Sequence, residues 1–448
     1  MALKNRNEIK LNKKHQGKEF RNEFRFVGLV KPVRKKEQDG DNWFDVPLFQ
    51  NTTTQTNKDR RVLQFNVETA YRNELKVELA GMEKEVAYIY SSKHRKSAPV
   101  DWADRENKAA YPDDTYHYIQ QEWDKTEAIS KYVKEEMWVD VRGHYEFDKF
   151  TNGEGEEFKS VKRIIDQVYP LKNGEVEIKG LKKDDTFRVY DSETEGYQLG
   201  FGKADEKGVA VIKVGWLNPE GGKLFVCKVD GETEGQRSAV EYSDTGAETD
   251  RIIVRNNVTG DIQMIGDDGK RKYVPYVRDF KSPEFTEVNS FEMQIGIKST
   301  YQDEQTQDTK VNAVYLSYGK EKSVPKDVEL TVYYKEAEEG KKPFADAFAR
   351  LNRFDFLVVE GVDNNRAEFA MVEVQESEED DNPFEDVGEK TTSFEQVSTG
   401  TKKGLEILTY IGGTFKRELL TEEEISEDQP VSDDPFASVN ISEDELPF

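Results

Sequence analysis

The chain has 448 residues and a formal net charge of −25, and charged and hydrophobic residues each make up 35% of it. This length predicts two to four domains, and so polar a composition predicts small β domains beside disordered segments. The single cysteine, Cys227, excludes an intramolecular disulfide framework. Neither a secretory h-region nor an apolar run of about 18 residues occurs, so we expect a cytoplasmic protein without a membrane span.

The charge is divided unevenly along the chain. Residues 1–36 hold 12 Lys and Arg against 3 Glu, whereas residues 375–448 hold 21 Asp and Glu against 5 Lys and Arg. The N-terminal third is therefore the part best able to approach phosphate groups, and the C-terminal part is repelled by them.

The N-terminal part of the chain predicts a basic arm followed by a β barrel. Residues 1–20 lack an apolar period and predict a flexible arm, whereas residues 21–171 contain short alternating apolar runs typical of strands. A short helix is predicted at 126–133, before the last two strands. This order is that of an OB-fold barrel, and a partly open barrel of another kind is the alternative. The predicted strands cover 24–33, 62–71, 75–80, 86–90, 137–143 and 158–169.

A second segment, 266–374, repeats the same order of strands and helix. Residues 138–143 align with 356–361 at an offset of 218, which indicates a duplicated barrel. A common β pattern without duplication is the alternative. Between the two segments, residues 172–265 are rich in glycine and closely spaced strands and predict a small all-β domain. The strands predicted in the second segment cover 291–298, 312–317, 328–334, 354–361 and 367–374, with a helix at 344–351.

Residues 375–448 predict a disordered acidic tail. One apolar island within it, 404–412, is either a strand that docks back on the body or a partner-binding peptide. The sequence thus predicts a mainly β protein with one or two OB-fold-like barrels, a β-sandwich-like middle domain and a disordered tail.

Single strands of DNA are bound by basic grooves and by aromatic rings on which the bases stack. Residues 1–170 supply both kinds of side chain around the predicted first three strands and their loops. The alternative is that the aromatic rings belong to the core and the cations to a solvated rim. The candidate residues for binding single-stranded DNA are Lys35, Lys36, Trp43, Phe44, Arg60, Arg61, Phe65, Tyr71, Arg72, Tyr88, Tyr90, Lys93, Arg95 and Lys96.

The sequence contains no clear catalytic or metal-binding motif. The four histidines, His15, His94, His117 and His144, lack zinc-ligand spacing, and one cysteine cannot complete a cysteine-rich site. We therefore predict no catalytic residue, no metal and no cofactor, and a protein that is not an enzyme.

The last sixteen residues, from Asp433 to Phe448, form a run of acids that ends in Leu446, Pro447 and Phe448. They resemble the C-terminal tail of bacterial single-stranded DNA-binding proteins, especially those of Gram-positive bacteria. In that family the tip recruits replication, recombination and repair enzymes. The resemblance implies a partner-binding tip made of Glu443, Asp444, Glu445, Leu446, Pro447 and Phe448.

The body is much longer than that of the ordinary bacterial family member, so the resemblance implies a larger, phage-encoded protein in a bacterial host cytoplasm. It implies a protein that coats and protects single-stranded DNA. Two alternatives stay open: an adaptor that captures replication proteins through the tail without binding DNA, and a virion structural protein. The sequence does not predict the oligomeric state.

Overall fold

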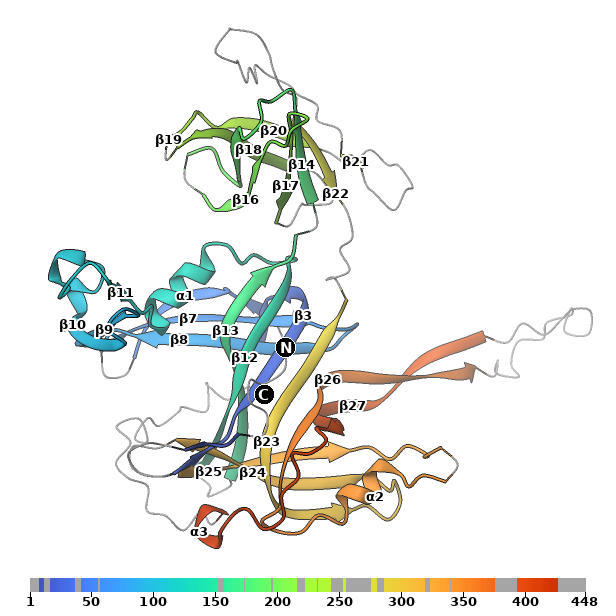
Figure 1. Ribbon diagram of the computed structural model, residues 1–448. Helices are drawn as coiled ribbons and strands as arrows, with labels where there is room; N and C mark the ends of the chain where they lie inside the picture. Colours follow the sequence, from blue (N-terminus) through green and yellow to red (C-terminus); the bar gives the residue numbers. More distant parts are fainter. Residues whose placement is uncertain are drawn as a thin grey trace, which may run out of the picture.

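Strands dominate the computed structural model of the chain (Figure 1). The mainly β fold class is confirmed, and the largest sheet has 11 strands. None of the helices in the described ranges is long and apolar enough to cross a membrane. The structure describes residues 8–11, 17–36, 42–54, 57–151, 157–172, 174–194, 196–215, 222–231, 233–242, 253–254, 275–279, 286–318, 323–338, 340–374 and 393–425.

The first barrel has the strand order of an OB fold. Its five strands are β3 (Asn22–Lys31), β7 (Asp59–Glu68), β8 (Glu74–Met82), β12 (Trp138–Thr151) and β13 (Glu157–Pro170). Strand β3 pairs with both β7 and β12, and a parallel contact between Ile164 and Glu78 joins β13 to β8. Helix α1 (Glu122–Ser130) stands between the third and fourth barrel strands. Closure in the order first, second, third, fifth and fourth strand defines this barrel.

The second barrel repeats this order. Its strands are β23 (Val288–Gln302), β24 (Thr309–Tyr318), β25 (Ser323–Val332), β26 (Phe356–Val374) and β27 (Ser393–Tyr410), and helix α2 (Phe344–Phe348) precedes the fourth. A parallel contact between Leu330 and Leu405 again joins the third strand to the fifth. Both OB-like barrels of the predicted fold are therefore present.

Both barrels bend their fourth strand at one glycine. The register shifts next to Gly143 in β12 and next to Gly361 in β26, positions separated by the offset of 218 residues found in the sequence. A Cβ at Gly143 would lie 1.9 Å from the Ile164 carbonyl oxygen, and one at Gly361 would lie 1.9 Å from that of Glu406. Only glycine allows such an approach of two backbones.

The fifth strand of the second barrel corrects the predicted boundary of the tail. Strand β27 lies inside the predicted tail 375–448 and pairs along its whole length with β26. Its Leu405 and Ile407 are buried in the main core, which explains the apolar island at 404–412 as a docked strand. The tail prediction is therefore wrong for residues 393–425. Residues 375–392 and 426–448 lie outside the described residues.

The middle domain is formed by two small sheets, one of β17, β14, β22 and β21 and the other of β15, β16, β18, β19 and β20. They share a core of residues such as Val176, Phe187, Ile212 and Val226. Strand β22 belongs here, although the sequence placed residues from 266 onward in the second barrel. The strands are β14 (Gly174–Lys179), β15 (Thr186–Tyr190), β16 (Gln198–Lys203), β17 (Val209–Val214), β18 (Gly222–Asp230), β19 (Thr233–Glu234), β20 (Ser238–Tyr242), β21 (Ile253–Val254) and β22 (Pro275–Asp279).

The described part of the predicted flexible arm is docked on the second barrel, so that prediction is wrong for residues 8–11 and 17–20. Strands β1 (Lys10–Leu11) and β2 (Lys18–Glu19) pair with each other. Phe20 is buried against Phe356, with the ring centroids 5.3 Å apart. Lys18 forms an ion pair of 2.8 Å with Glu424 of α3 (Glu422–Ile425). The burial of the Phe20 ring holds this segment on the second barrel. The basic composition of residues 1–20 gave no sign of this contact.

The two barrels meet where β3 pairs with β23, and we call this boundary the seam. A buried polar cluster joins the two barrels across it. Asp363 of the second barrel is fully buried and accepts two hydrogen bonds from Arg163 of the first, at 2.7 and 2.8 Å. The Tyr145 hydroxyl donates a third, at 3.0 Å. Burial raises the pKa of Tyr145 well above its ordinary value, so this hydroxyl keeps its proton.

Candidate nucleic-acid interface

The connection between the first two strands of the first barrel forms a hairpin of β4 (Val33–Lys36) and β5 (Trp43–Val46). Lys35 lies opposite Phe44, and Lys36 lies opposite Trp43. The Trp43 side chain is 60% exposed and that of Phe44 is 45% exposed. This loop is one of those with which OB folds bind oligonucleotides, and it presents two rings beside two cations.

A separate sheet of β10 (Lys96–Asp101), β9 (Val86–Ser91) and β11 (Tyr116–Tyr118) presents two further rings. The prediction that 86–90 is a strand of the barrel is wrong, because β9 pairs only with β10 and β11 among the described strands. Its alternation places Tyr88 and Tyr90 on one face, about 6.7 Å apart along the strand. They are 53% and 40% exposed.

Further apolar and basic groups surround these two tyrosines. Pro99 lies opposite Tyr88 on one side, and the amide of Ile119 donates to the Tyr88 carbonyl on the other. His117, which is exposed, lies opposite Tyr90. Sequence reasoning missed Ile119 and His117, although their alternation with buried Tyr116 was a signal. The predicted cations Lys93 and Arg95 follow in the turn from β9 to β10, and Lys96 begins β10.

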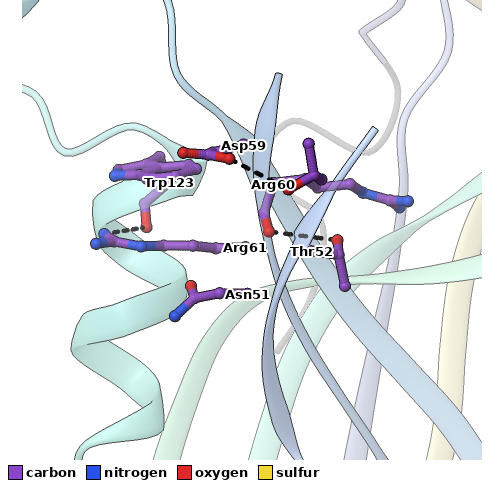
Figure 2. A pocket seen from close by; sticks show the side chains of 7 residues that line it. Asn51, Thr52, Asp59, Arg60, Arg61 and Trp123 are labelled. Carbon is purple, nitrogen blue, oxygen red and sulfur yellow. Dashed lines mark hydrogen bonds between the residues drawn. The ribbon is translucent and has the colours of Figure 1, made fainter. Parts of the chain in front are cut away.

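Arg60 and Arg61 have different surroundings (Figure 2). Arg61 forms an ion pair of 2.7 Å with Glu127 of α1, and its guanidinium lies 4.2 Å from the centre of the Trp123 ring. These contacts fasten the helix to the barrel, which is a structural role. Arg60 points to the other side of β7 and lines an open cavity of about 330 Å³ together with Asn51, Thr52, Thr53, Asp59, Arg61 and Trp123.

Phe65 cannot stack on a base, and its assignment to the site is wrong. Its side chain is fully buried in the barrel core, because Phe65 shares the inner face of β7 with Leu63 and Val67. Tyr71 and Arg72 lie instead at the turn from β7 to β8. Tyr71 is 70% exposed, and the Arg72 guanidinium lies 5.1 Å from the centre of its ring.

The structure thus separates the exposed candidate rings into the β4–β5 hairpin, the β9 sheet and the β7–β8 turn. The outer face of β7 and β8 between them carries acids beside its cations. Glu68, Glu74 and Glu78 lie there, and Lys76 forms an ion pair of 3.0 Å with Glu78. Cations and rings are therefore concentrated in the loops and in the inserted sheet. The predicted partner-binding residues, Glu443 to Phe448, lie outside the described residues.

No group of three or more His, Cys, Asp or Glu side chains within the described ranges is arranged to hold a metal ion. Two of the histidine rings contact carboxylates. His94 contacts Asp113 at 3.1 Å, and His144 contacts Asp166 at 3.0 Å. Hydrogen bonds from Thr115 hold the pKa of Asp113 below its usual value, so this partner of His94 is ionised at neutral pH.

No protein-family model matches the chain, and no curated protein matches it. Among solved structures, the chain is similar to the crystal structure of a deletion mutant of the single-stranded DNA binding protein from Thermus aquaticus. The similarity covers 90% of this chain and 97% of that chain, with a TM-score of 0.30 and 9% sequence identity. The assignment of the two OB-like barrels rests on their own strand order.

Proposed function

We propose that the protein binds single-stranded DNA through the first barrel and its insertions, and that it is a binding protein rather than an enzyme. The observation that carries this proposal is the exposure of five of the six predicted aromatic side chains, by 40 to 70%. Trp43 adjoins Phe44, and Tyr88 shares a strand face with Tyr90; grouped exposed apolar side chains, unlike scattered single ones, mark interaction sites. The rings lie beside lysine and arginine side chains on OB-fold loops, which is the combination that sequence-tolerant recognition of single strands needs.

Stacking contributes about 1–3 kcal/mol per base, so the Tyr88 and Tyr90 platform alone supplies a large share of the affinity. Duplex DNA keeps its bases stacked on each other and cannot use these rings. We therefore expect a strong preference for single strands, with a salt dependence set by the flanking cations.

The acidic C-terminal tip is the second part of this function. We propose that Glu443 to Phe448 recruits replication, recombination or repair enzymes to the coated strand, as the resemblance of the tail implies. An apolar ring that follows a run of acids suits a small pocket edged by basic side chains. A phage-encoded protein that acts in its host's cytoplasm would meet such enzymes there.

Fluorescence anisotropy of the full chain with labelled oligo-dT, duplex DNA and RNA of equal length tests the DNA-binding part. We expect oligo-dT to bind more tightly than duplex, and the Tyr88→Ala/Tyr90→Ala variant to bind it at least about tenfold more weakly, because 1.4 kcal/mol is a factor of ten. Phe201→Ala, which removes an exposed ring from the middle domain, is the matched control. Absence of binding at low salt, or equal binding of duplex and oligo-dT, would overturn the proposal.

A further inference from the structure

A second set of aromatic rings and cations lies on the outer face of the second barrel, where the sequence assigned no site. Tyr301 of β23 lies opposite Lys310 of β24, and Lys310 lies opposite Thr331 of β25. Directly paired residues share one face of a sheet, so the three side chains form a row across the barrel. Tyr301 is 60% exposed, and the Lys310 amine donates to the Thr331 hydroxyl at 3.0 Å.

Tyr333 continues this row toward the fifth strand. Its ring centre lies 6.0 Å from the Lys310 amine and 3.8 Å from the Lys402 amine of β27. Lys402 is also paired with Glu406 at 2.8 Å, and both side chains are largely buried. Lys402 is therefore a positioning residue that holds the tyrosine ring, and its charge is already balanced by Glu406.

The row reaches the first barrel at the next strand. Arg366 of β26 lies opposite Lys402 and is exposed. A β-bridge joins Arg366 to Asn73, the last residue of the turn that carries Tyr71 and Arg72. The β7–β8 strands of the first barrel reach β26 of the second at this point (Figure 1). Within the described residues, no ion pair involves Lys310 or Arg366.

Hydrogen bonds across the seam fix these two parts in one register. The Asn365 amide donates to the Asn73 side chain at 2.7 Å, and the Asn365 side chain donates to the Glu74 carbonyl at 2.8 Å. Buried Asn73 also donates to the Asp363 carbonyl, at 3.4 Å. The turn of the first barrel is thus held against the fourth strand of the second.

We infer that a single DNA strand crosses the seam on this surface, which we name the cross-barrel track. Its rings are Tyr71, Tyr333 and Tyr301, and its exposed cations are Arg72, Arg366 and Lys310. From β23 to β26 the track spans four inter-strand steps, or about 19 Å at about 4.8 Å each. That length suits a few stacked nucleotides, within the site size of about 4–16 nucleotides of one OB fold. The inference rests on the proposed function and extends it to the second barrel.

Two variants of the full chain test the track: Tyr301→Ala, and Lys310→Gln combined with Arg366→Gln. Binding is measured on oligo-dT of about 10 and about 30 nucleotides, which span roughly one and two OB sites. We expect both variants to bind the longer strand about five- to tenfold more weakly. The double variant should also flatten the salt dependence by about 1.4 log units per log unit of salt, because each phosphate contact on a single strand contributes about 0.7.

Lys341→Gln is the charge control, since Lys341 is exposed and its charge is paired with Glu338. Unchanged thermal unfolding midpoints show that the variants fold.

Photo-crosslinking with iodouracil-substituted oligo-dT adds a direct readout, and we expect crosslinks at Tyr301 or Tyr71. Affinity and salt slope that stay unchanged in both variants, with no crosslink on the track, would overturn the inference. If oligo-dT binds and only Tyr88→Ala/Tyr90→Ala weakens it, the track fails while the proposed function stands; if oligo-dT does not bind at all, the proposed function itself fails.

Discussion

Asp363 is the residue on which the relation between the two barrels depends most. Its carboxylate belongs to the second barrel and accepts three hydrogen bonds from two side chains of the first, Arg163 and Tyr145. Asn289 also donates to its carbonyl at 2.8 Å. A buried ion pair of this kind adds little net stability over apolar packing, but removal of one charge leaves the other buried and uncompensated. The cluster therefore specifies one arrangement of the barrels.

Asp363→Asn should lower the free energy of unfolding by about 3–5 kcal/mol, because the Arg163 charge would lose its partner in the interior. Urea denaturation of the full chain measures this change. Glu338→Gln makes the same chemical change at an exposed ion pair with Lys341 and should cost at most about 1 kcal/mol. Equal effects of the two substitutions would contradict the role assigned to Asp363.

His144 gives the fold a small pH dependence. A hydrogen bond from the His144 Nδ1 to Asp166 raises the pKa of His144 above its ordinary value of about 6.5. The stability that this pair contributes is fully present below the unfolded pKa and is lost as the pH rises through the folded one. NMR titration should show His144 titrating above 6.5, and Asp166→Asn should lower that pKa. An unchanged pKa in the variant would refute the assigned cause. Both side chains are about half exposed, so the effect on stability should be small.

At the scale of elements, the alternation of apolar residues predicted those strands that have a clear local pattern. Alternation located the five strands of the first barrel, to which 86–90 was wrongly added, and four of the five strands of the second, with β26 divided into 354–361 and 367–374. The repeat at an offset of 218 aligned the two glycines at which the bends occur. The closing strand β27 was missed because Ser393 to Lys403 is polar and follows a run of acids, so only the part from Leu405 onward shows an apolar signal. Strand β27 is the last strand of the second barrel because it pairs with β26. Such pairing between distant segments cannot be predicted from a local pattern.

The candidate site was predicted less completely than the fold, for a similar reason. The loop-like context of Trp43 and Phe44 agrees with their exposure. The β9 tyrosines were assigned to a barrel strand, and the separate sheet that exposes them was not predicted. The ion pair of Arg61 was not predicted, because its partner Glu127 lies 66 residues further along the chain. The cross-barrel track joins a turn near residue 72 to strands beyond residue 300, and only the folded barrels bring these together.

The glycine bends should be sensitive to a single added methyl group. Gly143→Ala and Gly361→Ala each place a Cβ against the carbonyl of the fifth strand, so each should cost about 1–3 kcal/mol of unfolding free energy. Gly412→Ala is the control, since a Cβ there meets no atom within 4 Å. Circular-dichroism melting curves compare the three variants. A Gly412→Ala variant as destabilised as the other two would show that general backbone entropy, and not the close approach, is responsible.

For the molecule as a whole, the separation of acidic and basic segments along the chain affects the binding of DNA, which is a polyanion. The net charge is −25, and residues 426–448 hold seven acids and no Lys or Arg. These acids can approach the same cations that single-stranded DNA would contact. Removal of the tail must preserve β27 and α3, so a truncation belongs after Ile425 and not after Val374.

A chain that ends at Ile425 should bind oligo-dT several-fold more tightly than the full chain at low salt, because seven competing negative charges are removed. The difference should shrink toward zero near 1 M salt, where the screening length is only about 3 Å. Anisotropy titrations across a salt series measure both effects. Phe448→Ala keeps every acid and should leave DNA affinity unchanged while it weakens capture of partner enzymes, which separates the charge of the tail from its tip. Equal affinities of the truncated and full chains at low salt would mean that the tail does not compete for the DNA-binding surface.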